Sequence, residues 1–168
     1  MEGSTAAIEL GIPARAEYVA LARLVVSSIA SSRRDLADDR IDDLKVAVSE
    51  ACTNAIEAHR KASTTDPVSI VCSETDERFV VAVRDRGAGF DPAMLPEHPP
   101  VTDPERLNFE RGLGIPLIRT LVDGVEIESS GDGTEVRLIM LCGPADMLDD
   151  DMFDTDFEIP DGAQEAAP

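Results

Sequence analysis

Apolar residues recur with two different periods along the chain, and these periods predict helices and strands. Helical spacing from about Ala14 to Ser31 and from about Asp38 to Arg60 predicts two long helices. Either Asp38 or Asp39 is the expected cap of the second helix. The apolar positions at helical spacing in the first helix are Val19, Leu21, Ala22, Leu24, Val25 and Ile29. The second helix is expected to bury Ile41, Leu44, Val48, Cys52, Ala55 and Ile56.

Shorter apolar runs, bounded by turn residues, predict strands. The expected strands are Ala6 to Ile12, Val68 to Ser73, Phe79 to Arg84, Val125 to Ser129 and Thr134 to Leu141, with a third helix from about Leu113 to Leu121. A polar, proline-rich stretch from Asp91 to Glu110 has no period. Loops of that length in a compact domain are usually lids or binding loops. The pattern therefore predicts one folded domain that contains both helices and strands.

The charge of the chain is strongly negative and unevenly distributed. Its 168 residues carry 34 acidic and 15 basic side chains, a formal net charge of -19. A surface of that sign repels nucleic acid, so the sequence argues against direct nucleic-acid binding. Nine of the acids and none of the bases fall in residues 142–168, where no helical or strand period is visible. We therefore expect a folded domain over residues 1–141 and a disordered acidic tail over residues 142–168.

The sequence shows no pattern typical of export or membrane insertion. The N-terminal segment has no basic region followed by an apolar run, and no stretch approaches the roughly 20 apolar residues that cross a bilayer. The three cysteines, Cys52, Cys72 and Cys142, are widely spaced and form no CxxC pair. We therefore expect buried free thiols in a reducing cytoplasm, rather than a metal site or a disulfide framework, and no membrane partner.

Two polar side chains on the second predicted helix are candidates for a metal site. Glu50 and Asn54 are four residues apart, which places them on one face of a helix about a turn from each other. A carboxylate beside a carboxamide suits Mg²⁺, which prefers hard oxygen ligands and keeps several waters. An isolated pair with this spacing also fits a solvated helix surface, so both interpretations stay open.

A second candidate segment follows directly after the predicted strand that ends at Arg84. It contains Asp85, Gly87 and Gly89 in a DxGxG pattern. A carboxylate at a strand end can accept a hydrogen bond from an exocyclic amine, and glycines let the backbone approach a flat ring closely. The same pattern also fits a turn that merely closes a strand.

A third candidate segment stands where the long loop meets the third predicted helix. It consists of Arg111, Gly112 and Gly114. Glycines that open a helix expose free N–H groups toward a phosphate, and the helix dipole adds to that preference. A GxG pattern alone is also compatible with a flexible hinge.

These segments occur in an order that resembles a known superfamily. ExxxN on a helix is followed by DxGxG after a strand, a long loop, GxG at a helix start, and Gly133-Thr134 at the last strand. The order resembles the N, G1 and G2 boxes of the GHKL ATPase/kinase superfamily, with an ATP lid at about residues 91–111. Bacterial anti-sigma-factor serine/threonine kinases have a segment similar to Val48-Ser49-Glu50-Ala51-Cys52-Thr53-Asn54-Ala55-Ile56 of this chain. The resemblance covers about Ile8 to Leu141. It implies an α+β Bergerat fold, a two-layer α/β sandwich whose mixed, mostly antiparallel sheet has helices on one face.

The resemblance also implies a role for each polar residue. Asn54 would coordinate the Mg²⁺ that bridges the ATP phosphates. Glu50 would act as general base toward an attacking serine hydroxyl, or position a water. Asp85 would bind the adenine amino group, and Thr134 would support it through a hydroxyl or a shared water.

The glycines and the arginine complete the implied ATP site. Gly87 and Gly89 would shape the adenine floor, and Gly112 and Gly114 would present backbone N–H groups to the phosphates. Arg111 would close the lid over the γ-phosphate. Metal and donors together would stabilise charge on the transferring phosphoryl group.

The resemblance further implies protein partners. These are a sigma factor, a STAS-type anti-anti-sigma protein as the phosphorylated antagonist, and a second copy of the chain in a homodimer. Arg23, in the first predicted helix, is a candidate sigma contact, and a solvated helix arginine is an equal alternative. An acidic surface suits a sigma factor that carries basic surfaces.

The sequence departs from the family pattern at two points. Members commonly carry a histidine four residues after the asparagine, where this chain has Ala58, and His59 follows one position later. His59 itself is expected at the surface near the end of its helix. The lid has no second basic residue beside Arg111, although Arg106 lies five residues before it.

Three functions follow from these observations. The intact boxes favour an anti-sigma factor that is also a serine kinase. The shifted histidine favours a binding module of the same fold that uses nucleotide only as a conformational ligand. The third function is the detached ATP-binding half of a histidine kinase. It is disfavoured because His59 and His98, the only histidines, lie within or after the nucleotide boxes.

Overall fold

The computed structural model describes residues 7–89 and 114–143, and it contains the predicted order of elements. The strands are β1 Ala7–Ile12, β2 Val68–Glu74, β3 Arg78–Arg84, β4 Gly124–Ser130 and β5 Gly133–Leu141. The helices are α1 Val19–Ala30, α2 Asp38–Ala62 and α3 Gly114–Leu121, and a short 3-10 turn, η1 Ala16–Tyr18, precedes α1. The structure thus divides the first predicted helix into η1 and α1.

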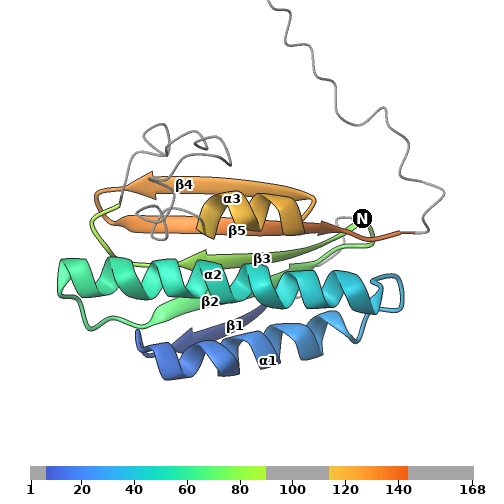
Figure 1. The fold of residues 1–168 in the computed structure, drawn as a ribbon, viewed down its shortest axis with the longest axis horizontal. Coiled ribbons are helices and arrows are strands. Elements are labelled where there is room, and N and C mark those ends of the chain that lie inside the picture. Colours follow the sequence, from blue (N-terminus) through green and yellow to red (C-terminus); the bar gives the residue numbers. More distant parts are fainter. Residues whose placement is uncertain (1–6, 90–113, 144–168) are drawn as a thin grey trace, which may run out of the picture.

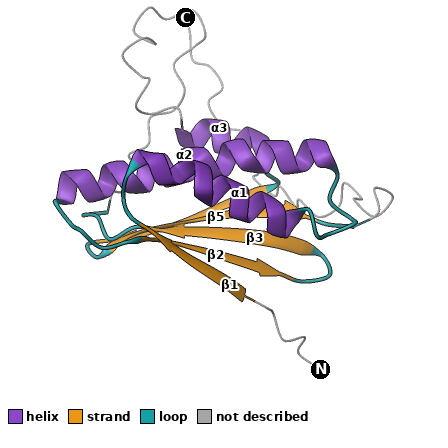
Figure 2. Ribbon diagram, turned by 90° about the horizontal axis from the view of Figure 1, so that it is seen from below, coloured by secondary structure: helices purple, strands orange, loops and turns teal. Residues whose placement is uncertain are grey.

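The strands form one sheet in the order β1-β2-β3-β5-β4, and all four pairings are antiparallel. Figure 1 shows α1, α2 and α3 side by side in front of the sheet. In Figure 2 the helices form one layer and the strands a second layer below it. The predicted α+β, two-layer fold with helices on one face of the sheet is confirmed. The resemblance predicts a mixed, mostly antiparallel sheet, and the described pairings are antiparallel throughout.

The long central helix, α2, follows its sequence pattern closely. Ile41, Leu44, Val48, Cys52 and Ala55 are buried as predicted. The predicted aspartate cap is wrong, because Ala37 occupies the N-cap and makes no side-chain cap hydrogen bond. The two aspartates instead lie in the first turn, where negative charge is favoured by the helix dipole.

The apolar positions that predict α1 are only partly buried in the structure. Leu21 and Leu24 are 44% and 62% exposed, whereas Ala22, Val26 and Ala30 are buried. Small side chains at the buried positions let α1 lie close beside α2, and this packing decides which apolar stripe faces inward. Two leucines of α1 therefore remain on the molecular surface.

A single apolar core fills the space between the sheet and the helices. Its largest fully buried members include Phe79, Leu44, Ile70 and Leu138. The three cysteines are buried and free, as predicted. None of the helices in the described ranges is both long and apolar enough to span a bilayer. The predicted lid and nearly all of the predicted tail lie outside these ranges, so the domain boundaries remain predictions.

Candidate functional site

A cavity of about 390 Å³ lies between α2, the start of α3, the C-terminal end of β3 and the N-terminal end of β5. Five of the predicted site residues line it together: Asn54, Asp85, Gly89, Gly114 and Thr134. Asn54 lies on α2, Asp85 and Gly89 follow β3, Gly114 begins α3, and Thr134 lies in β5. Up to 80 positions separate them in sequence. The volume lies within the range of about 300–1,000 Å³ that is usual for small-molecule sites.

Glu50 and Asn54 meet the first residue of α3. A Cβ atom built on Gly114 would lie 3.0 Å from Asn54 Nδ2 and 3.3 Å from Glu50 Oε2. Glycine at this position therefore leaves room between the two helices at the polar end of the cavity. Neither side chain makes a hydrogen bond or ion pair with any other described residue.

Asp85 is held in place by backbone groups on two sides. Its Oδ1 accepts hydrogen bonds from Gly87 N–H at 2.8 Å and Thr134 N–H at 3.2 Å. Its own N–H donates to the carbonyl of Thr134 at 2.9 Å. Within the described ranges Oδ2 has no partner, so the carboxylate keeps one oxygen for a donor in the cavity.

Thr134 lies next to Asp85 and is buried. Its hydroxyl is 3.0 Å from that of Ser129 across the β4–β5 hairpin, and either oxygen can be the donor. The direct contact of Thr134 with Asp85 is thus made by its backbone. The predicted support of adenine binding through the Thr134 hydroxyl or a shared water stays a prediction.

The two glycines after Asp85 bring the chain against its neighbours. A Cβ on Gly87 would lie 2.8 Å from the Cβ of Ala58, so this turn rests directly on α2. Gly89 has a φ of 70°. A Cβ there would overlap the carbonyl oxygen of Ser130, so both its conformation and its surroundings favour glycine.

His59 is not at the surface, and that prediction is wrong. The side chain is 1% exposed, and its Nε2 accepts a hydrogen bond of 2.7 Å from the N–H of Arg86. The turn after β3, which lies 27 positions further along the chain, covers the ring. Flanking Arg60 and Lys61 gave the sequence a surface character at this point, which the tertiary contact overrides.

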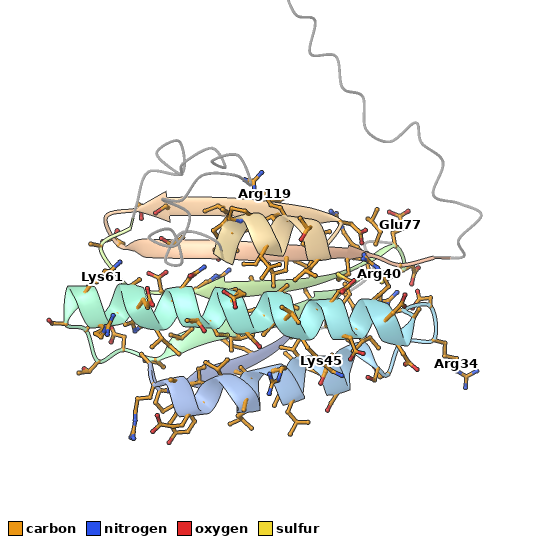
Figure 3. The ribbon with its side chains drawn as sticks, viewed as in Figure 1. Arg34, Arg40, Lys45, Lys61, Glu77 and Arg119 are labelled. Atoms are coloured by element: carbon orange, nitrogen blue, oxygen red, sulfur yellow. The ribbon has the colours of Figure 1, made fainter. Side chains whose placement is uncertain are left out.

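Sequence reasoning also missed several residues of the cavity wall. Glu57, Ala58 and Lys61 follow Asn54 along the same face of α2, at the helical spacing that would have identified them. The remaining wall is mainly apolar: Ala51, Ala55, Val83, Ala88, Ile115 and Val136. Figure 3 shows Lys61 at the C-terminal end of α2, far from Arg40 and Lys45. Lys61 is the one basic side chain of the described cavity wall.

The remaining predicted residues are not part of the described cavity. Arg111 and Gly112 lie outside the described residues. Arg23 is exposed on α1 between Leu21 and Leu24, so it belongs to a separate surface.

Cys52 lies on α2 between Glu50 and Asn54 but faces the core. Burial raises the pKa of its thiol to about 12. The thiol is therefore neutral at physiological pH and unsuited to act as a nucleophile. Chemistry at the site depends on the carboxylates, the amide and backbone groups.

These groups fit a nucleotide with a divalent cation. The oxygens of Glu50 and Asn54 are hard ligands of the kind that Mg²⁺ prefers. The free oxygen of Asp85 suits an exocyclic amine, and the apolar wall between them suits a flat ring.

The chain is similar to known proteins over most of its length. A family model described as the histidine kinase-like ATPase domain matches residues 12–140. The serine-protein kinase RsbW of Bacillus licheniformis is 41% identical over 125 residues, which are 72% of this chain and 77% of that protein. RsbW of Bacillus subtilis is 38% identical over 133 residues, which are 77% of this chain and 82% of that protein.

A solved structure supports the fold. The RsbU and RsbW domains of Rv1364c from Mycobacterium tuberculosis align with a TM-score of 0.60 at 18% sequence identity. The alignment covers 84% of this chain and 34% of that longer chain. At this identity the likeness concerns the fold alone.

Proposed function

This protein serine kinase belongs to the histidine kinase-like ATPase domain family, and we propose that it is an anti-sigma factor. It sequesters a sigma factor and uses Mg-ATP to phosphorylate a serine of a STAS-type anti-anti-sigma antagonist. One observation carries the proposal: Asn54, Asp85 and Gly114 line one cavity, and Glu50 Oε2 lies next to Gly114. The similarity to serine-protein kinases named RsbW supports serine as the acceptor.

Each residue of the cavity has a part in the proposed reaction. Asp85 uses its free Oδ2 to accept a hydrogen bond from the adenine amino group. Asn54 would hold Mg²⁺ through its amide oxygen, and the metal would supply positive charge that offsets the charge on the phosphates. Glu50 takes the proton of the attacking serine hydroxyl as the new O–P bond forms, while the bond between the γ-phosphorus and the bridging oxygen breaks and ADP leaves.

The phosphate-binding half of the site extends beyond the described residues. Gly114 begins α3 and binds phosphate through its backbone N–H. Gly112 is a second backbone donor, and Arg111 is the cation over the γ-phosphate. Helix starts favour phosphates because their first N–H groups are unsatisfied and the dipole is positive there. Gly87 and Gly89 shape the adenine side, since each lies too close to another segment of the chain for a larger residue to fit.

The proposed protein partners use other surfaces. Arg23 contacts the sigma factor, and the exposed Leu21 and Leu24 beside it supply apolar area for that contact. A homodimer is part of the proposal, as is a place in the cytoplasm, where sigma factors act. Direct contact with nucleic acid or a membrane has no part in it.

A phosphotransfer assay with two matched carboxylate variants tests the kinase activity. Purified protein is incubated with labelled Mg-ATP and STAS proteins encoded near its gene, and the modified residue is identified by mass spectrometry. Glu50→Gln should abolish transfer and keep ATP binding. Glu57→Gln, which changes a carboxylate in the same cavity wall two turns along α2, should keep both.

The outcomes separate the kinase from a binding module. Transfer to a serine that Glu50→Gln abolishes supports the proposal. ATP binding without transfer in every variant, together with nucleotide-dependent capture of a partner, would favour the nucleotide-sensing module instead. The observation that favours this second function is Ala58, which stands in the cavity wall where family members commonly carry a histidine.

A further inference from the structure

The strongest unexplained group in the described molecule is the buried imidazole of His59. It lies on α2, five residues after Asn54, and is 1% exposed. Figure 1 shows that the C-terminal ends of α2 and β3 lie at the same end of the molecule. There the ring accepts the Arg86 N–H on Nε2 at 2.7 Å, although the Arg86 side chain itself is exposed.

This hydrogen bond selects the tautomer of the neutral ring. Because Nε2 is the acceptor, the proton of the neutral imidazole must be on Nδ1. Nδ1 is buried and has no partner among the described residues. A buried donor without a partner is destabilising, and an apolar side chain of similar size would fill the space without that cost. Packing alone therefore does not account for a histidine here.

The bond to Arg86 acts on the turn that carries Asp85. From the sheet side, Thr134 holds the turn through its N–H and its carbonyl. From the helix side, Gly87 packs against Ala58. This van der Waals contact limits how closely the turn approaches α2, but it does not fix the orientation of the turn. His59 provides the one hydrogen bond from an α2 side chain to this turn within the described ranges.

We propose that His59 is a positioning residue that sets the orientation of the Asp85–Gly87 turn, and so the selectivity of the cavity for adenine. The inference rests on the proposed function, in which Asp85 accepts a hydrogen bond from the adenine amino group. Asn54 and His59 belong to the same rigid helix, so the bond to Arg86 fixes the distance between the metal-binding and the adenine-binding ends of the site. Without it, Asp85 loses its alignment while the phosphate end is unchanged.

A pair of amide variants tests the position of the acceptor rather than its polarity. In His59→Gln the side-chain oxygen reaches the place of Nε2, whereas in His59→Asn it reaches only the place of Nδ1. Dissociation constants are measured for Mg-ATP and for Mg-ITP, whose base has a carbonyl in place of the amino group. Thermal unfolding and circular dichroism verify that both variants are folded.

The expected result is a change of selectivity. Wild-type protein and His59→Gln should prefer ATP to ITP by a similar factor. Loss of one hydrogen bond predicts that His59→Asn binds ATP about tenfold more weakly and ITP with nearly unchanged affinity. In wild-type protein the Arg86 amide should be protected from hydrogen exchange, and His59→Asn should remove that protection.

Two results would overturn the inference. One is an ATP/ITP preference in His59→Asn equal to that of wild type, and the other is an Arg86 amide that exchanges freely in the wild-type protein. The hydrogen-exchange measurement needs no variant, so a folding defect cannot obscure it. Failure of wild-type protein to prefer ATP would instead contradict the proposed role of Asp85, and the inference with it. Asp85→Asn is the control that separates these cases, because it should abolish the preference whatever the state of His59.

Discussion

The replacement Gly114→Ala should separate the stability of this fold from its activity. Gly114 begins α3 and has an ordinary helical conformation, so alanine is compatible with its backbone. Gly→Ala changes at compatible sites stabilise a protein by about 0.4–1 kcal/mol, chiefly by restricting the unfolded chain. For a chain of this size, that gain raises Tm by roughly 1–4 °C.

The same methyl group should impair the site. It would lie 3.0 Å from Asn54 Nδ2 and 3.3 Å from Glu50 Oε2, so both side chains must move by a few tenths of an ångström. A misplacement of about 1 Å at a reacting centre costs about 100-fold in rate, and a shift of a few tenths therefore predicts about a tenfold loss of phosphotransfer. The direction of the activity change is thus opposite to that of the stability change.

The assay compares Gly114→Ala with Gly131→Ala. Gly131 lies in the β4–β5 turn, has no positive φ, and has no atom within 4 Å of an added Cβ, so its variant should resemble wild type in activity. Tm is measured by calorimetry and the transfer rate in single-turnover experiments with saturating Mg-ATP. If Gly114→Ala transferred phosphate at the wild-type rate, catalysis would not depend on the positions of Asn54 and Glu50, which would refute this reasoning.

Three further predictions concern the thiols, an ion pair and a turn. Because burial raises the pKa of Cys52 to about 12 and that of Cys72 to about 11, iodoacetamide at about pH 8 should leave both unlabelled in the native protein and label both after unfolding, as read by intact mass. The hydrogen bond from Arg33 lowers the pKa of Asp35, so the pair stabilises the fold above the unfolded value near 3.9, and this contribution is lost as pH falls through the folded value. Asp35→Asn should therefore lower stability at pH 7 by less than about 1 kcal/mol, and a Tm difference that persisted unchanged in strong acid would contradict this assignment. Gly89→Ala should lower stability by more than about 1 kcal/mol, because its φ of 70° and the Ser130 carbonyl both oppose a side chain; denaturant unfolding measures the loss, and an unchanged midpoint would count against it.

The sequence predicts most of the fold because local pattern and tertiary burial agree in most elements. On α2 a single apolar stripe points inward, and the buried residues follow it. On α1 two apolar stripes compete, and the one with Ala22, Val26 and Ala30 is buried because it fits close against the neighbouring helix. The larger leucines are left outside. A rule based on hydrophobicity alone selects the wrong stripe, since steric fit between helices is not contained in one segment.

The site was predictable in its residue types but not in its contacts. Spacing places Glu50 and Asn54 on one helix face, and only the folded chain brings Gly114 against them. The role of His59 was hidden for the same reason, because its partner is a backbone N–H 27 positions away and the neighbouring residues are polar. Contacts of this kind leave no periodic signal.

Because the cavity is acidic, nucleotide binding should depend on a divalent cation. Glu50, Glu57 and Asp85 lie in or beside the described cavity, and Lys61 is the one basic side chain in its described wall. A nucleotide triphosphate would therefore enter a site of its own sign, where repulsion is weakly screened because the walls are largely apolar. Under the proposed function, positive charge comes with the ligand as Mg²⁺ or from Arg111, which lies outside the described residues. It follows that nucleotide affinity should depend steeply on the divalent cation, more steeply than in a site lined by several arginines and lysines.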